Sequence, residues 1–199
     1  HYANLARNHV VVDDLVTLLR QRTRIPDASE FEGIFPSLPG YEFPGHILTA
    51  ERLDRSLQPE RVEAIHRCLD TQAPQGGVSL RYVVPWEEPA VVEAGSVDLI
   101  LSQAVLEHVV DLPRTYAACA EWLRPGGVMS HVIDFRSHRM TRNWDGHRQY
   151  PLWLWRVVHG TRPYLLNRLP LGAHLAQFGQ HGFAVVALER DVREPTIER

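Results

Sequence analysis

Asp134 and His138 are the residues of this sequence best placed to carry out chemistry. They lie at the end of, and just after, an apolar run from Val128 to Phe135 that is typical of a buried strand. Open α/β sheets bind their ligands at the carboxyl ends of parallel strands, which is where these two side chains are expected. An imidazole or a carboxylate in that position can accept a proton from a bound molecule. We therefore predict His138 or Asp134 as a catalytic base.

His131 and His147 lie close to that pair in the sequence, so a metal site is an alternative. Strand alternation argues against it, because His131 and Asp134 differ in parity and are expected on opposite faces of a strand. A metal site needs ligands that converge on one point. We therefore predict no metal ligands. A metal-dependent hydrolase that uses the His/Asp cluster remains a third hypothesis, after the two given below, and metal analysis of the protein tests it.

Two further polar residues, Gln103 and His108, follow the apolar run from Val97 to Leu101. Between the two runs, apolar residues recur at helical spacing as far as Leu123, and the sequence Arg-Pro-Gly-Gly at 124–127 ends the helix. Strand, helix and strand of this length predict a crossover with two adjacent parallel strands, each buried on both faces. The imidazole of His108 either contributes to the site or ties its loop to the sheet.

The same segment carries a family resemblance. The motif D-L-I-L-S-Q-A-V-L-E-H-V at 98–109, followed by E-W-L-R-P-G-G-V at 121–128, resembles class I S-adenosylmethionine-dependent methyltransferases of the type 11-like group. The motifs S-H-V-I-D-F-R-S-H at 130–138 and N-R-L at 167–169 are similar to a branch of bacterial methyltransferases whose substrates are unassigned. The resemblance covers the second half of the chain better than the first.

What the resemblance implies is a three-layer Rossmann-like α/β fold, with a mostly parallel sheet and an antiparallel closing strand. The implied activity is transfer of a methyl group from S-adenosylmethionine to an oxygen or nitrogen of a small molecule. The implied cofactor contacts are Ser102, Gln103 and His108 after one strand, and Trp86 over the adenine. Trp86 lies where the family usually has an acidic residue, and its alternative role is to pack its own loop.

The cofactor platform of that family is absent from the sequence. The family holds the cofactor on a glycine-rich turn after its first strand and on an acidic residue that ends the second. The two glycine pairs here, Gly76-Gly77 and Gly126-Gly127, do not follow a predicted first strand. We therefore expect a sheet that is incomplete at its N-terminal side and weak binding of S-adenosylmethionine. An upstream segment or a homodimer partner would complete the sheet, and the alternative function is a noncatalytic scaffold.

Outside the central crossover, the sequence predicts elements of a single domain spanning residues 1–199. The predicted elements are an amphipathic helix at 1–22, a Pro- and aromatic-rich loop at 23–48, a helical region at 49–71 divided near Gln58, and a strand at 78–84. The loop serves either as a lid over a substrate pocket or only for packing.

The C-terminal part adds an aromatic-rich helical insertion at 139–170, a helix at 172–181 and a closing strand at 183–188. The insertion forms either a small satellite core or a cap that selects the methyl acceptor. Pro151 is the expected start of its helix.

Composition indicates which partners to expect. The net charge is −3, the pI is near 6.4 and no basic run is present, so we expect neither a nucleic acid nor a membrane as partner. The sequence shows no signal peptide and no apolar run long enough to span a bilayer. Cys68 and Cys119 are expected to be buried thiols of a cytoplasmic protein.

Overall fold

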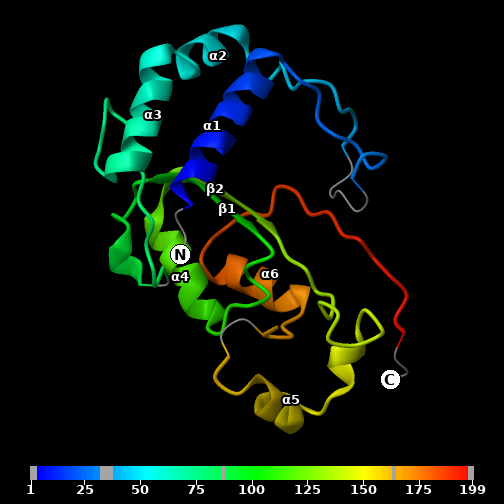
Figure 1. Cartoon of the computed structure of the whole chain (residues 1–199). Coiled ribbons are helices and arrows are strands. Elements are labelled where there is room, and N and C mark those ends of the chain that lie inside the picture. Colours follow the sequence, from blue (N-terminus) through cyan, green and yellow to red (C-terminus); the bar gives the residue numbers. More distant parts are fainter. Residues whose placement is uncertain (1–3, 32–37, 87, 163–164, 197–199) are drawn as a thin grey trace. The chain divides into compact units, whose positions relative to one another are not determined.

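The computed structural model describes residues 4–31, 38–86, 88–162 and 165–196. Parts of the predicted loop at 23–48 and of the predicted insertion at 139–170 therefore lie outside the described residues. The chain forms two compact units, His1–Tyr82 and Val83–Arg199, which are described separately (Figure 1). The prediction of a single domain stays a prediction.

The described residues of the first unit form three helices, α1 (Leu5–Arg20), α2 (Ala50–Ser56) and α3 (Pro59–Thr71). The break between α2 and α3 confirms the predicted division near Gln58, because Pro59 starts a new helix at its first position. The side chain of Thr49 accepts a hydrogen bond from the backbone of Arg52 and so caps α2. Ala64 and Cys68 of α3 form a small core with Val78.

A chain of four polar side chains, here called the histidine clasp, joins α1 to α3. His9 and His66 approach to 2.6 Å between their Nδ1 atoms, and their rings are stacked within 8°. The Nε2 atom of His9 lies 2.8 Å from Asp70, and the Nε2 atom of His66 lies 3.0 Å from Asp13. All four ring nitrogens of the clasp therefore have a partner.

The predicted strand at 78–84 is wrong. The segment forms only one isolated antiparallel bridge, between Gln75 and Val78. Leu80, Tyr82 and Val84 are 41%, 68% and 64% exposed, so these side chains are not buried in a sheet. β-branched and aromatic residues favour a strand only where a neighbouring strand pairs with it.

The predicted loop at 23–48 has neither helix nor strand in its described parts, 23–31 and 38–48, as expected. The backbone of Ile25 donates a hydrogen bond to the carbonyl of Tyr41 at 2.7 Å, which joins the two described parts. A role as a lid stays a prediction.

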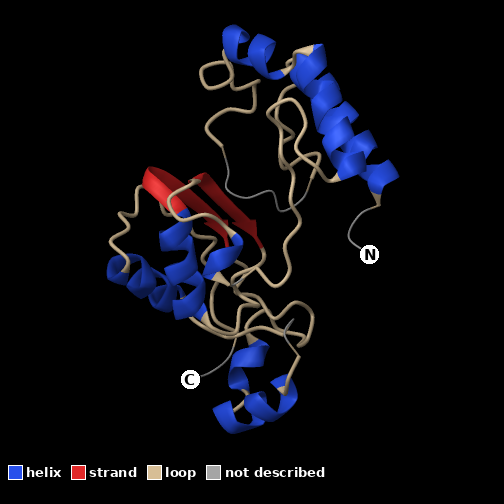
Figure 2. Ribbon diagram, turned by 90° about the vertical axis from the view of Figure 1, so that its left-hand side faces the viewer, coloured by secondary structure: helices blue, strands red, loops and turns tan. Residues whose placement is uncertain are grey.

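The second unit is built on two parallel strands, β1 (Val97–Gln103) and β2 (Leu123–Val132), connected by α4 (Leu112–Trp122). Figure 2 shows the two strands side by side, in red. This confirms the predicted crossover. Strand β2 begins five residues earlier than predicted and ends at Val132, three residues before Phe135.

Helix α4 covers one face of these strands. Ile100 and Met129 pack toward α4, against a core that contains Ala118, Cys119 and Trp122. On the opposite face Leu99, Leu101 and Val128 are 49%, 69% and 55% exposed. The prediction that both faces are buried is therefore wrong, and a three-layer arrangement is not seen among the described residues.

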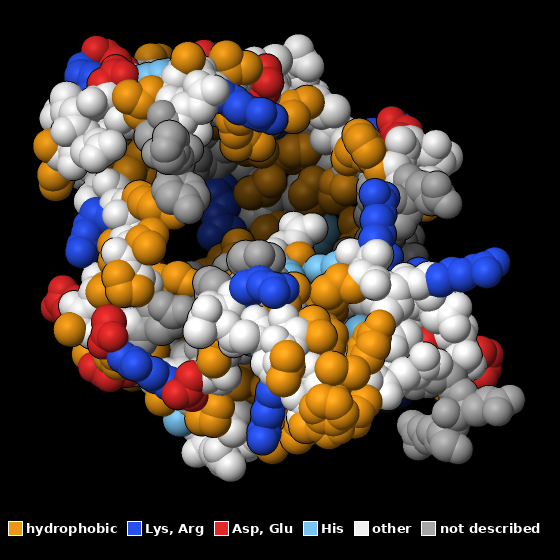
Figure 3. All heavy atoms as spheres, turned by 60° about the horizontal axis from the view of Figure 1, so that its bottom comes forward, with side chains coloured by type: hydrophobic (Ala, Val, Ile, Leu, Met, Phe, Trp, Pro, Cys, Tyr) orange, Lys and Arg blue, Asp and Glu red, His pale blue; other side chains and the backbone are white. Residues whose placement is uncertain are grey.

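Two helices follow the strands, α5 (Leu152–His159) and α6 (Leu171–Gln180). They confirm the predicted helices in both places, and Pro151 directly precedes α5. Leu152, Trp153 and Val157 of α5 are 60%, 67% and 70% exposed. In Figure 3 the lower part of Figure 1, where α5 lies, is turned toward the viewer, and apolar side chains, in orange, are exposed on this face.

The predicted closing strand at 183–188 is also wrong, because the segment is irregular and Val186 is 93% exposed. Its C-terminal continuation is held by polar contacts. The indole of Trp144 donates to the carbonyl of Glu194 at 3.1 Å, and the backbone of Thr196 donates to Asp145 at 3.0 Å. Hydrogen bonds with Trp144 and Asp145 therefore hold residues 194–196, and no strand pairs with this segment among the described residues.

Candidate functional site

The two parallel strands end next to each other, with Gln103 opposite Val132. The chain then turns sharply after each strand, since Ala104 has a φ of 51° and His138 and Arg139 have φ values of 50° and 65°. Left-handed backbone is uncommon for residues other than glycine and is enriched at functional sites. The two segments after the strands, 104–109 and 133–139, form the candidate site.

Asn167 fixes the first of these segments from a distance in the sequence. Its side-chain amide donates to the carbonyls of Leu106 and Val109 at 2.8 and 2.9 Å. Its backbone amide donates to the carbonyl of Glu107 at 2.7 Å. The N-R-L motif thus has a structural explanation, because Asn167 holds the loop that carries Glu107 and His108.

Glu107 is the residue of this site that the sequence analysis missed. It is 3% exposed, and neither of its carboxylate oxygens has a hydrogen-bond partner. Its Oε1 atom lies 4.0 Å from Nε2 of His108 and 3.8 Å from Nε2 of His138. Burial raises the pKa of the Glu107 carboxyl, although its own backbone amide and, less strongly, the two histidines oppose that shift. Glu107 therefore lies buried beside two imidazoles, without a hydrogen-bond partner.

The imidazoles of His108 and His138 meet edge to face, with ring centroids 5.1 Å apart. The Nδ1 atom of His108 is buried and has no partner. The side chain of His138 remains 29% exposed, so it is accessible from solvent. The two predicted site residues His108 and His138 thus come together.

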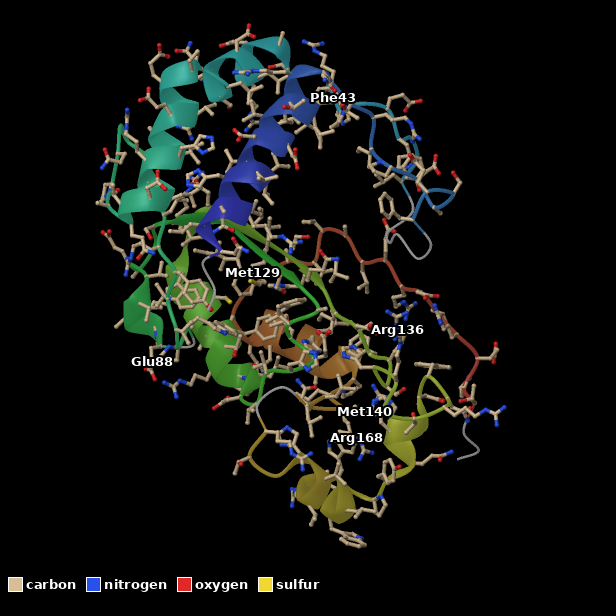
Figure 4. All side chains as sticks on the ribbon, in the orientation of Figure 1. Phe43, Glu88, Met129, Arg136, Met140 and Arg168 are labelled. Carbon is tan, nitrogen blue, oxygen red and sulfur yellow. The ribbon has the colours of Figure 1, made fainter. Side chains whose placement is uncertain are left out.

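Asp134 contacts His138 directly, with Oδ2 3.2 Å from Nε2. The guanidinium of Arg136 donates to both oxygens of this carboxylate at 2.7–3.0 Å, and the Arg136 backbone donates at 2.9 Å. Burial alone raises the pKa of Asp134, but the hydrogen bonds from Arg136 outweigh it and lower the pKa to about 2. Figure 4 labels Arg136 on the segment that follows β2. Asp134 is therefore a firmly held anion that orients His138.

Two other predicted residues lie near the strand ends but outside this cluster. Ser102 points to the helix-covered face, where its hydroxyl lies 2.8 Å from Nδ1 of His131. His131 also stacks on Phe178 of α6. Gln103 is exposed at the end of β1. Their roles toward a cofactor stay predictions.

Trp86 and His147 are both packed among apolar neighbours. Trp86 is partly buried against the apolar clusters around Tyr116 and Trp122, which corresponds to its packing alternative. His147 is 1% exposed and faces Trp155, and burial lowers its pKa to about 4. The structure thus does not bring His131 or His147 into the Asp134–His138 pair.

The structure brings Glu107, His108 and His138 together as a possible ligand set, with one ligand atom from each within 4.8 Å of the others. The sequence predicted no metal ligands, because strand alternation was expected to place His131 and Asp134 on opposite faces. Glu107 stands directly before His108 in the L-E-H-V motif, and that adjacency is the signal that could have identified it.

Comparison with known proteins agrees with this geometry. Residues 56–130 match a family model described as a methyltransferase domain. This match and the curated relatives support a class I S-adenosylmethionine-dependent methyltransferase. The matched residues include β1, α4 and most of β2, whose parallel crossover agrees with the Rossmann-like α/β fold of this family.

Curated relatives carry a more specific name. The ubiquinone biosynthesis O-methyltransferase of Cronobacter sakazakii is 32% identical over 126 residues, which are 63% of this chain and 44% of that protein. The protein of the same name from Escherichia fergusonii is 31% identical over 127 residues, 63% of this chain and 45% of that protein. The chain thus spans less than half the length of these relatives.

No solved structure shows a significant match to the chain. None of the helices in the described parts has the length and apolar character that crossing a bilayer requires. Cys68 and Cys119 are buried free thiols, as the sequence predicted.

Proposed function

We propose that this methyltransferase segment contributes to methyl transfer from S-adenosylmethionine to an oxygen or nitrogen of a small molecule. The observation that carries the proposal is the Asp134–His138 pair, 3.2 Å apart, at the carboxyl ends of two parallel strands. The relatives are named O-methyltransferases, which favours oxygen as the acceptor atom.

Such a reaction needs alignment and proton removal, because the methyl group of the donor is already activated. His138 is the proposed base. It is partly exposed, and Asp134 holds its ring through Nε2. Asp134 is a poor base near neutral pH because its pKa is about 2, so its proposed role is to orient the imidazole and to stabilise the imidazolium that forms.

The residues proposed to contact the cofactor fit S-adenosylmethionine only in part. Gln103 and His108 lie at the strand ends, where a ligand of this fold binds. The glycine-rich turn and the acidic ribose ligand of the family have no counterpart in the sequence. Loss of two charged hydrogen bonds would cost about 3–6 kcal/mol, or roughly two to four decades of affinity. No catalytic step is therefore assigned to Ser102, Gln103, His108 or Trp86.

The outer face and the unpaired edges of the β1–β2 sheet support a second part of the proposal. Leu99, Leu101 and Val128 are about half exposed or more, and no third strand pairs with this sheet in the described residues. We propose that another segment of a longer native protein, or a second subunit, completes the three-layer fold and supplies the cofactor platform. Segment 139–170, with its exposed α5, is the proposed cap over the acceptor.

The test is titration calorimetry with S-adenosylmethionine, on these 199 residues and on the longest native protein that contains them. We expect weak or undetectable binding to the former and micromolar binding to the latter. Micromolar binding to the 199 residues alone would contradict the incomplete platform. Absence of binding to both would favour the noncatalytic scaffold, for which the missing glycine-rich turn is the supporting observation.

A further inference from the structure

We propose that Glu107, His108 and His138 form a binding site for a divalent transition-metal ion of the Zn²⁺ type. One ligand atom from each residue lies within 4.8 Å of the other two. Two imidazole nitrogens and one carboxylate oxygen are the donors that zinc and its neighbours in the first transition row prefer, whereas Mg²⁺ and Ca²⁺ prefer oxygen alone.

The buried carboxylate is the strongest argument. Charged groups are seldom buried without a partner, because an ionised carboxylate loses its hydration on burial. Both oxygens of Glu107 are buried and have no hydrogen-bond partner, and the Nε2 atoms of the two imidazoles lie 3.8 and 4.0 Å from Oε1. A cation between the three side chains would bind Glu107 and the two Nε2 atoms together.

The ligands must close up to hold an ion. An ion about 2.0–2.2 Å from each ligand holds tetrahedral ligand atoms roughly 3.3 Å apart. The two separations from Oε1 of Glu107 are 3.8 and 4.0 Å, and all three ligand atoms lie within 4.8 Å of one another, so the closure is roughly 0.5–1.5 Å. His108 and Glu107 lie in a loop fixed by Asn167, whereas His138 lies in a partly exposed left-handed turn. His138 is therefore the ligand that moves and the side from which an ion enters.

Asp134 becomes an outer partner in this arrangement. Nε2 of His138 lies 3.2 Å from Asp134 and 3.8 Å from Glu107, so the same nitrogen can face either carboxylate. Metal binding would turn Nε2 of His138 toward Glu107, while Asp134 would keep its hydrogen bonds from Arg136. Three protein ligands leave one position open for water or for a ligand oxygen, as in catalytic zinc sites.

One consequence rests on the proposed function. If the acceptor oxygen occupied the open position, the ion would make that oxygen more acidic, and His138 would serve as a ligand in place of a base. Binding of the ion itself does not depend on methyl transfer.

The experiment is titration of the metal-free 199-residue protein with Co²⁺, followed by visible absorption, and with Zn²⁺, followed by calorimetry. We expect one ion per chain with micromolar or tighter affinity and visible bands of low-symmetry Co²⁺. Glu107→Gln keeps the size of the side chain and should weaken binding at least about 100-fold, as should His138→Ala. Circular dichroism confirms that each variant is folded.

The matched control is His9→Ala in the histidine clasp. This change also removes one imidazole, but both ring nitrogens of His9 already have partners. It should leave the strong Co²⁺ site unchanged. Binding no tighter than millimolar, or equal binding in Glu107→Gln, would overturn the proposal, and water or a proton would then satisfy Glu107. A small cavity of about 10 Å³ beside Glu107 and Asn167 has room for one such water.

The two proposals fail in different ways. Absence of metal binding together with loss of turnover in His138→Ala would leave His138 as a base and remove the metal site. Metal binding in a protein that transfers no methyl group would keep the site and remove the proposed function.

Discussion

Each of the two units contains a cluster of histidines and carboxylates, and the two clusters differ in whether their polar atoms have hydrogen-bond partners. In the histidine clasp of the first unit, every ring nitrogen of His9 and His66 has a partner within 3.0 Å. In the site of the second unit, the buried carboxylate of Glu107 and the Nδ1 atom of His108 have none. Clusters of histidine and carboxylate are therefore best distinguished by hydrogen-bond satisfaction and not by composition.

The physical reason is that a satisfied polar network stabilises a fold, whereas an unsatisfied buried group lowers stability and is retained where it serves another purpose. The carboxylates of the clasp, Asp13 and Asp70, are 67% and 60% exposed, so water completes their solvation. Glu107 has no such access. Four predictions test this contrast, in order of decreasing effect.

The largest expected effect is on turnover. In the native protein, His138→Ala should lower the methyl-transfer rate by roughly two to four decades at neutral pH, because a general base or a metal ligand is lost. His9→Ala should change the rate less than about twofold. Release of S-adenosylhomocysteine with a panel of small phenols and amines measures both. If His138→Ala changed the methyl-transfer rate as little as His9→Ala does, His138 would have only a structural role.

The second effect is acid destabilisation of the second unit. Burial, followed by the influence of His131, lowers the pKa of His174 from 6.5 to about 4. Because this pKa is lowered in the folded state, the contribution of neutral His174 to the free energy of unfolding is fully present above pH 6.5 and is lost as the pH falls toward 4. The loss should amount to about 2–3 kcal/mol. Urea unfolding at several pH values measures it, and His174→Gln should flatten the dependence.

The third effect is a gain in stability. Glu107→Gln should raise the free energy of unfolding by about 1–2 kcal/mol at neutral pH, because the amide avoids the cost of burying an unpaired charge. The raised pKa of Glu107 means that its penalty is absent below pH 4.5 and develops as the pH rises through the folded value. Chemical unfolding of metal-free protein at pH 4 and pH 7 tests this. A loss of stability at pH 7 would show that Glu107 has a partner.

The smallest effect belongs to the clasp. Asp70→Asn removes an exposed charge beside His9 and should lower the stability of the first unit by less than about 1 kcal/mol. Helical circular dichroism during urea unfolding measures it. A loss above 2 kcal/mol would mean that the clasp, and not apolar packing, holds α1 on α3.

Local signals predicted the helices and the crossover well. The Pro59 start, the Pro151 start and the Arg-Pro-Gly-Gly stop depend on backbone chemistry that neighbours in sequence determine. The strands predicted at 78–84 and 183–188 failed because pairing depends on distant partners. Asp134 and His138, predicted from their position after the second strand, lie 3.2 Å apart, and their catalytic role stays a prediction.

Glu107 was not predicted because its significance arises only in three dimensions. Its sequence neighbours suggest an ordinary loop residue before His108. Its burial depends on Asn167, sixty residues away, which draws the loop into the interior. Likewise, His131 lies near Asp134 in sequence, but its ring packs among aromatic side chains of α4 and α6.

The β1–β2 ribbon has a consequence for the colloidal behaviour of the protein. Its outer face presents Leu101 at 69% and Val128 at 55% exposure, and both of its long edges carry backbone amides that no other described strand engages. Such edges are templates for strands of neighbouring molecules. Above a threshold concentration, these 199 residues on their own should associate edge to edge and scatter light, while mild urea or a lysine in place of Leu101 should keep them dispersed.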